Sequence, residues 1–352
     1  MLPIHGLASP VTSRERRLGA LVAVLLGTNA LAFLFLLSAR APSAAKTFSQ
    51  GIYIDWAKVK YIDLTHPIEP GMPLWDAFGQ PKIGAAHAGN PIEGFIGVGD
   101  EFTYASHGFV ATDVALHTDQ MGTQLDPPAH WNELGATITD VPPTVSLRPL
   151  CVIDITPQVA TKEDYHASVE DVLAWEKLHG RVPSGSVVLF RSDWSKGWEG
   201  YKVNGMPALF PGVGLDALKF LHLKRGVLVH GHEPLDTDTT PSLEGEAWLM
   251  HNNYMQIEGA TNLDLLPPTG CLVSIGFAKI QGGTGGYVHL VAVCPTDWSE
   301  GVTIEDAPGA PLPAQTAPLR RGVDGVMRPT PGATPTAYCA NGTGALGCPL
   351  PE

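Results

Sequence analysis

One short stretch of the chain, residues 116–131 (LHTDQMGTQLDPPAHW), carries four polar side chains that could bind a metal or transfer a proton. They are Gln120, Gln124, Asp126 and His130. Gln124 and Asp126 are two residues apart, so an extended backbone places both on one face. The glycine between them and Gln120 permits a tight turn, and the proline pair after Asp126 stiffens the backbone that carries the carboxylate. Core packing does not explain this set, which predicts a metal site or a polar reaction site.

A second polar group follows an apolar run further along the chain. Ligand-binding residues of α/β proteins often collect beyond the carboxyl ends of strands, which is where this group is expected. A structural alternative remains open, with the first histidine hydrogen-bonded in the core and the two aspartates capping a loop or a helix. The group consists of His230, His232, Glu233, Asp236 and Asp238.

Two glutamates, Glu246 and Glu258, frame a segment with a helical pattern followed by a strand-like one. Glu258 lies in an otherwise apolar context. A carboxylate in such a place must be paired with a cation, protonated or bound to a metal. The whole chain has only 22 lysines and arginines to pair with.

The elements expected to position these residues alternate between apolar β-rich runs and amphipathic helical segments. This order is typical of an α/β fold, here with a mixed sheet. The many glycines and prolines, 39 and 31, indicate short elements and numerous turns. Strands are expected near residues 61–64, 109–116, 150–155, 186–191, 226–230, 255–260, 271–275 and 289–294, and helices at 168–179, 215–223 and 244–253.

The composition excludes several classes of protein. A hydrophobic fraction of 44% and a charged fraction of 16% are those of a globular chain. The net charge of −13 argues against nucleic acids and anionic membrane surfaces as partners, because both require basic patches. A small-molecule substrate is the partner that the polar reaction site leads us to expect.

The N-terminal residues 1–45 have the pattern of an export signal. Arg14, Arg16 and Arg17 precede an uncharged apolar run at residues 18–39, which is long enough to span a bilayer as a helix. Two alternatives stay open, a retained membrane anchor and a cleaved signal peptide. Either predicts an exported protein that is periplasmic, secreted or membrane-anchored.

Export affects how the five cysteines are interpreted. In an oxidising compartment, Cys339 and Cys348 would close a small disulfide loop within the proline-rich tail at residues 307–352. Cys151, Cys271 and Cys294 lie in apolar strand-like runs and are expected to be small core residues. The tail is expected to be extended, and the folded domain is expected at residues 56–297.

The motif GTQLDPPAH at residues 122–130 resembles the HxGTHxDxPxH motif of the metal-dependent cyclase, or kynurenine formamidase-like, hydrolase family. Residues 63–73, 187–194, 227–238, 246–264 and 279–293 resemble further family segments in the expected order. The resemblance implies a swivelling β/β/α domain that forms dimers or larger homo-oligomers. It also implies an enzyme that hydrolyses carbon–nitrogen bonds with a divalent metal, commonly zinc or manganese.

Carried over by position, the resemblance assigns individual roles. Asp126 and Glu258 correspond to metal ligands, with Glu258 also placed among the catalytic residues, and His130 corresponds to the general acid/base. Gln120, Gln124 and Glu246 stand where the family has ligand histidines. We therefore expect a variant, GTQxD branch of the family with oxygen-rich ligands, which favour Mn²⁺ or Mg²⁺ over Zn²⁺.

The sequence thus predicts an extracytoplasmic metal-dependent hydrolase of a small amide, cyclic amide or lactone. His130 is the expected general acid/base, and His232, Glu233 and Asp236 are the expected substrate-binding or supporting residues. Two alternatives remain, a metal-free cyclase or dehydratase on the same scaffold and a non-catalytic protein that binds a small ligand.

Overall fold

The computed structural model describes residues 54–304, 306, 312 and 314–336. The predicted signal or anchor helix and the predicted Cys339–Cys348 loop lie outside these residues. Within the described part of the chain, no helix combines the length and the apolar character needed to cross a membrane.

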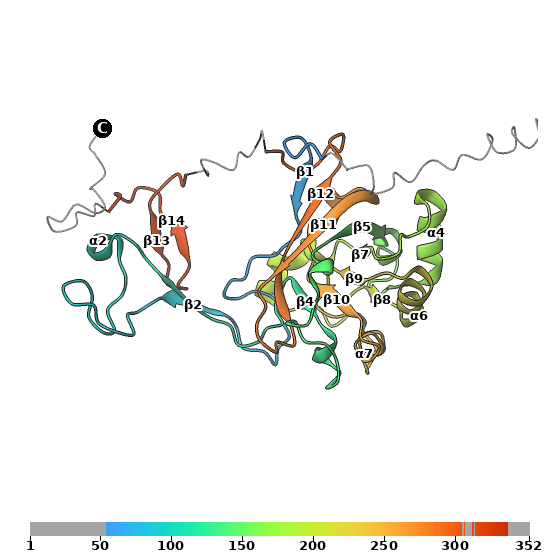
Figure 1. Ribbon diagram of the computed structural model, residues 1–352, viewed down its shortest axis with the longest axis horizontal. Helices are drawn as coiled ribbons and strands as arrows, with labels where there is room; N and C mark the ends of the chain where they lie inside the picture. Colours follow the sequence, from blue (N-terminus) through green and yellow to red (C-terminus); the bar gives the residue numbers. More distant parts are fainter. Residues whose placement is uncertain (1–53, 305, 307–311, 313, 337–352) are drawn as a thin grey trace, which may run out of the picture. The chain divides into compact units, whose positions relative to one another are not determined.

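An eight-stranded mixed sheet forms the centre of the fold (Figure 1), in the order β1-β12-β11-β5-β7-β9-β10-β4. β4 pairs with β12 as well as with β10, so the sheet closes on itself like a barrel. Its strands are β1 (Lys60–Asp63), β4 (Gln124–Asp126), β5 (Leu147–Asp154), β7 (Val187–Arg191), β9 (Val229–His232), β10 (Met255–Glu258), β11 (Thr269–Phe277) and β12 (Gly286–Cys294).

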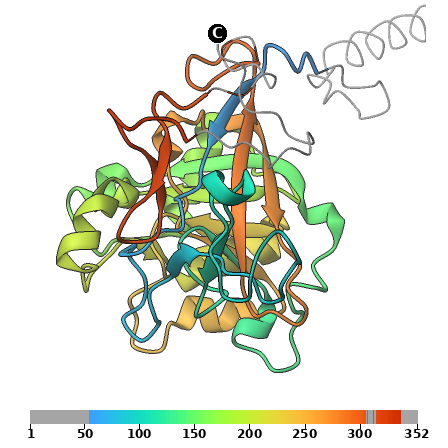
Figure 2. The same ribbon diagram turned by 90° about the vertical axis from the view of Figure 1, so that its left-hand side faces the viewer.

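Strands β5, β7, β9 and β10 are parallel neighbours, while β1, β4, β11 and β12 join the sheet antiparallel. Both views show β1 beside the long strand β12 (Figures 1 and 2). The predicted mixed α/β fold is therefore confirmed. The closure of the sheet was not predicted, because it depends on pairing between residues far apart in the sequence.

Alternation along the strands separates two cores. Leu125, Leu189, Val229 and Ile257 belong to an apolar cluster to which nearly every strand of the closed sheet contributes, so this cluster fills the interior. Residues whose side chains point to the other face of the sheet, such as Phe190, pack with α4 and α6 in a second apolar cluster. Figure 1 shows these helices along β5, β7 and β9.

The helices begin and end where local sequence signals place them. Ser168 and Asp171 form a complete capping box at the start of α4, and Gly180 ends that helix. Beyond Lys219 the predicted amphipathic helix widens into a π-helix. The helices are α2 (Tyr104–His107), α3 (Thr156–Val159), α4 (Val169–His179), α5 (Trp198–Asn204), α6 (Leu215–Lys219), α7 (Glu244–His251), the 3₁₀ turns η1 (Pro128–His130), η2 (Pro143–Val145), η3 (Trp194–Gly197) and η5 (Leu263–Leu265), and the π-helix η4 (Phe220–Arg225).

Three small two-stranded sheets complete the fold. One of them, β13–β14, lies in the segment predicted to be an extended tail, where Arg321 donates hydrogen bonds to the carbonyls of Gly325 and Ala111. These contacts give the proline-rich segment partners that its composition does not reveal. The pairs are β2 (Lys82–Ala85) with β3 (Thr112–Ala115), β6 (His166–Ala167) with β8 (Gly212–Val213), and β13 (Leu319–Arg321) with β14 (Met327–Pro329).

The three cysteines expected in the core, Cys151, Cys271 and Cys294, are buried there. Cys271 and Cys294 also form a disulfide between β11 and β12, with Cα atoms 4.2 Å apart, which the sequence did not predict. The antiparallel register, which pairs Leu272 with Val293, brings the two cysteines face to face at the ends of the strands. Cys151 is free.

Candidate metal centre and catalytic cavity

The pairing of β4 with β10 builds the floor of the site. Gln124 lies opposite Glu258, and Asp126 lies opposite Gln256. Because side chains alternate along a strand, these four project to the same side, away from the apolar interior that the intervening leucine and isoleucine enter. The short motif that opens β4 and the strand that ends at Glu258 therefore form one polar surface.

Glu246 on α7 joins two of these side chains to make a cluster of three carboxylates. Oxygens of Asp126, Glu246 and Glu258 all lie within 4.8 Å of one another, and all three residues are buried. They are three of the five predicted metal ligands, contributed by β4 and, more than a hundred residues later, by the consecutive elements α7 and β10.

Two glutamine amides hold the carboxylates of the floor. Gln124 Nε2 donates to Asp126 Oδ1 over 3.1 Å and to Glu258 Oε2 over 3.0 Å. Gln256 Nε2 donates to Glu258 Oε1 over 2.8 Å, and its carbonyl oxygen accepts from Thr237. Gln256 was not predicted, although its spacing of two residues from Glu258 is a signal that could have identified it.

Burial without a cationic partner dominates the electrostatics of the cluster. Burial raises the pKa of Asp126 to about 7 and raises those of Glu246 and Glu258 well above their usual range. The charge of Asp126 raises the pKa of both glutamates further. Such a cluster needs either protons or a bound cation.

The donor set fits a hard divalent cation. All three groups offer carboxylate oxygens, the ligands that Mg²⁺, Mn²⁺ and Ca²⁺ prefer. Glu246 Oε2 is buried and has no hydrogen-bond partner among the described residues, so this oxygen is available to a cation.

His130 lies at the edge of this cluster, at the end of η1. Its Nε2 is 3.5 Å from Glu246 Oε1, and its Nδ1 contacts the amide nitrogen of Gln120. The amide donates, so Nδ1 accepts and the proton of the neutral imidazole resides on Nε2. Burial lowers the pKa of His130, which keeps the ring neutral near neutral pH.

Gln120 acts on His130 rather than on the carboxylates. Its amide nitrogen donates to the carbonyl of Thr284 over 3.1 Å as well as to the imidazole, and so makes no hydrogen bond to the three carboxylates. Gly285 packs against it, and a Cβ there would lie 2.5 Å from Gln120 Cγ. Gln120, a predicted metal ligand, therefore holds His130, the predicted acid/base.

The cluster opens into a cavity of about 390 Å³, a volume suited to one small ring-containing molecule. Its walls divide by chemistry. The apolar part consists of Trp75, Phe78, Trp131, Met206, Leu235 and Leu243, and the polar part of Gln120, Gln124, His130, Asp236, Glu246 and Glu258. Trp131 also donates to Glu246 Oε1 over 2.9 Å and so fixes that carboxylate.

The second predicted polar group is divided by the structure. Asp236 lines the cavity, where burial raises its pKa to about 6. His232 is buried beside the floor, on the strand next to β10, with Nε2 3.3 Å from Thr237 Oγ1. Asp238 accepts from the backbone of Gly245 in the first turn of α7, the capping role that was left open. His230 is fully buried beside His232, and neither of its ring nitrogens has a partner among the described residues.

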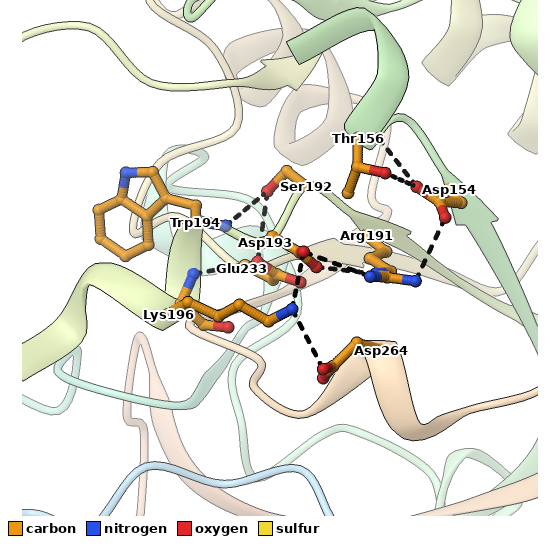
Figure 3. Close-up of polar contacts among 10 residues, drawn as sticks. Asp154, Thr156, Arg191, Ser192, Asp193, Trp194, Lys196, Glu233 and Asp264 are labelled. Carbon is orange, nitrogen blue, oxygen red and sulfur yellow. Dashed lines mark hydrogen bonds and ion pairs between the residues drawn. The ribbon is translucent and has the colours of Figure 1, made fainter. Parts of the chain in front are cut away.

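Glu233 does not reach the cavity, contrary to the prediction. It accepts from the backbone of Ser195 over 3.0 Å and from Ser192 Oγ over 3.4 Å (Figure 3). It follows His232 directly, and neighbouring side chains on a strand point to opposite sides. Its buried carboxyl therefore supports the η3 turn instead.

Comparisons with known proteins find similar hydrolases. Isatin hydrolase of Roseibium aggregatum is 28% identical over 207 residues, which are 54% of this chain and 78% of that protein. The solved structure of isatin hydrolase A from Labrenzia aggregata, bound to benzyl benzoate, is 26% identical with a TM-score of 0.58, covering 67% of this chain and 94% of that one. Isatin hydrolase A from Ralstonia solanacearum has the same identity and TM-score, over 72% of this chain and 98% of its own.

The family model described as putative cyclase matches residues 62–239, half of the chain. The match includes β4, Asp236 and the motif that ends at His130, whereas α7 and β10 lie beyond it. These comparisons confirm the predicted enzyme class, a hydrolase, and the chain belongs to the putative cyclase family of metal-dependent hydrolase-like proteins.

Proposed function

We propose that this chain hydrolyses a carbon–nitrogen bond of a small amide or cyclic amide, or opens a small lactone, with a divalent metal and His130 as the general acid/base. One observation carries the proposal. A cluster of three buried carboxylates opens, through Glu246 and Glu258, into a cavity of about 390 Å³ that a neutral imidazole also lines. The relatives that resemble this chain are isatin hydrolases, which supports a ring-opening reaction.

Asp126, Glu246 and Glu258 are the residues that would hold the metal. Their oxygens favour Mn²⁺ or Mg²⁺ over Zn²⁺, which prefers nitrogen and sulfur. Bound there, a divalent ion supplies polarisation of the scissile carbonyl and lowers the pKa of water.

His130 would move the proton. The imidazolium that forms when Nε2 takes the proton of the attacking water can return that proton to the leaving nitrogen of an opened amide. Rotating the Gln120 amide by half a turn would present its carbonyl oxygen to Nδ1–H and leave Nε2 free to accept a proton from the attacking water. In this proposal Gln120 is the positioning residue that decides which tautomer faces the substrate.

The test is hydrolysis of isatin and of an aryl formamide by the purified full chain. His130→Ala should lower kcat by a factor of about 10²–10⁴, the usual worth of a positioned acid/base. His251→Ala is the matched control, because it removes an exposed histidine from the outer face of α7. Chelation should abolish turnover, and one divalent metal should restore it. Full turnover by His130→Ala would overturn the mechanism.

A metal-free cyclase or dehydratase is the second candidate, and one observation favours it. Gln124 and Gln256 already donate hydrogen bonds to Asp126 and Glu258. Amide donors can satisfy these carboxyls without a cation if the remaining charge is removed by protonation. Elemental analysis of the purified protein separates the two, since the hydrolase requires a stoichiometric metal and the cyclase does not.

We also propose that the protein works outside the cytoplasm. The basic-then-apolar pattern of residues 1–45 supports this, and so does the Cys271–Cys294 disulfide, because such bonds persist in oxidising compartments. Cell fractionation with thiol labelling tests the idea. A cytoplasmic protein with both cysteines reduced would contradict it.

A further inference from the structure

We infer that Asp236 binds a nitrogen donor on the substrate, so that the cavity prefers aromatic rings carrying a cationic or N–H group and discriminates against aromatic carboxylates. This inference rests on the proposed function, because it describes what the same cavity recognises. It assigns Asp236 to the substrate and separates it from the three carboxylates of the metal cluster.

The first argument is that Asp236 alone among the cavity carboxylates lacks a protein donor. Glu246 receives the indole N–H of Trp131, and Glu258 receives both glutamine amides of the floor. Asp236 lines the same cavity and has neither a hydrogen bond nor an ion pair with any described residue. A half-buried carboxylate of this kind gains most from a partner that arrives with the ligand.

The second argument is the chemistry of the apolar part of the cavity. Trp75 and Phe78 contact each other edge to face, with centroids 5.1 Å apart, and line the cavity together with Trp131. Aromatic walls favour a flat ring, and a ring held against them can present one edge to a polar group. Asp236 is a polar residue of this cavity that no protein donor occupies.

The third argument is the net charge. Asp236 lies close enough to act electrostatically on Asp126, Glu246 and Glu258. Among the described residues that line the cavity, none is a lysine or an arginine. Even a divalent ion would leave four ionised carboxylates with a negative sum, which disfavours an anionic ligand and favours a cationic one.

The experiment uses three ligands of nearly equal shape and different charge: benzamidine, benzamide and benzoate. Binding to the metal-free full chain is followed by tryptophan fluorescence, because Trp75 and Trp131 line the cavity. The wild type should bind benzamidine most tightly and benzoate most weakly. A charge-assisted hydrogen bond corresponds to a preference of about tenfold or more for benzamidine over benzamide.

Asp236→Asn should reduce that preference about tenfold and strengthen benzoate binding, because it removes the charge and keeps the shape. Asp236→Glu should keep the order, and Asp113→Asn, an exposed change on β3, should leave every affinity as in the wild type. Equal urea midpoints verify that each variant is folded.

The inference is overturned if the wild type binds benzoate as tightly as benzamidine, if none of the three ligands binds, or if Asp236→Asn leaves the order unchanged. Its failure is separable from that of the proposed hydrolase. Hydrolysis that depends on His130, together with an unchanged ligand order in Asp236→Asn, would retain the reaction and remove only this role of Asp236.

Discussion

Asp126→Asn should stabilise the metal-free protein above neutral pH, although it removes a charge from the centre of the site. Asp126 is fully buried, and burial raises its pKa from 3.8 to about 7. For an acid whose pKa is raised by folding, the penalty is absent below the unfolded pKa, grows between the two values and is complete above the folded one. The shift corresponds to a penalty of about 4 kcal/mol at pH values above 7.

The variant also changes hydrogen bonds, because Gln124 and Gln256 both donate to this carboxylate. That cost does not depend on pH, whereas the relief of charge does. The difference in unfolding free energy between variant and wild type should therefore rise by about 4 kcal/mol between about pH 4 and pH 8. Contributions from buried histidines are the same in both proteins and cancel in the difference.

The assay is urea unfolding of chelator-treated protein at a series of pH values, with Asp113→Asn as the exposed control. Adding Mn²⁺ should narrow the difference at alkaline pH. Saturation at about a hundred times the dissociation constant stabilises the wild type by about 3 kcal/mol, and the variant should gain less. A difference that does not change with pH would refute the reasoning, because Asp126 would then not titrate between these limits.

Three further changes test separate parts of the structure. Gln120→Met should lower kcat about 10–100-fold without changing metal affinity, because Gln120 contacts His130; a loss of metal affinity would instead make Gln120 a ligand. Burial lowers the pKa of His222 to about 4, so the wild type loses about 3 kcal/mol of unfolding free energy as the pH falls from 6.5 to about 4. His222→Phe should remove this loss. A variant whose stability falls as steeply as that of the wild type over this pH range would contradict the expectation. The double change Cys271→Ala and Cys294→Ala should cost about 3 kcal/mol in urea unfolding, and reduced wild type should match it; equal stability of oxidised and reduced protein would show that the bond contributes nothing.

The elements with strong local signals could be predicted from the sequence. The helix at 168–179 was expected from its apolar spacing and terminal glycine, and α4 occupies residues 169–179. The strand-like runs at 150–155 and 186–191 became β5 and β7, parallel neighbours in the sheet. In each case the hydrophobic period and the flanking residues agree with the final fold, so local and tertiary preferences coincide.

Features that depend on long-range register could not be predicted. Closure of the sheet through β4 and β12, and the meeting of Cys271 with Cys294, require knowing which strands pair and in what alignment. Apolar composition around a cysteine carries no information on its partner. The extended tail was predicted from composition alone. Composition cannot reveal that Arg321 donates a hydrogen bond to the carbonyl of Ala111 and so holds the β13–β14 hairpin.

The site also combines residues that local sequence signals predict with residues whose placement depends on the fold. Asp126 and His130 were expected to act together because they share one short motif. Glu258 was expected to need a partner because it lies in an apolar segment, and Glu246 was expected because it stands where the resembled family has a ligand histidine. Glu233 was placed in the site by proximity in sequence, and the alternation of a strand placed it elsewhere. The direction of a side chain at a strand end depends on phase, and an error of one residue moves a carboxylate to the other face.

Gln120 and Gln124 interact differently from the histidines that the resembled family has at their positions. An imidazole can offer a metal its ring nitrogen, whereas an amide offers a neutral oxygen or donates hydrogen bonds. Gln124 donates to two carboxylates of the floor, and Gln120 donates to the imidazole. With Glu246 on α7, the site then combines acidic oxygens with amide donors and has no cation of its own among the described residues that line the cavity. Its charge must be balanced by what it binds, and this requirement connects the expected metal, the elevated pKa values of the carboxylates and the preference inferred for Asp236.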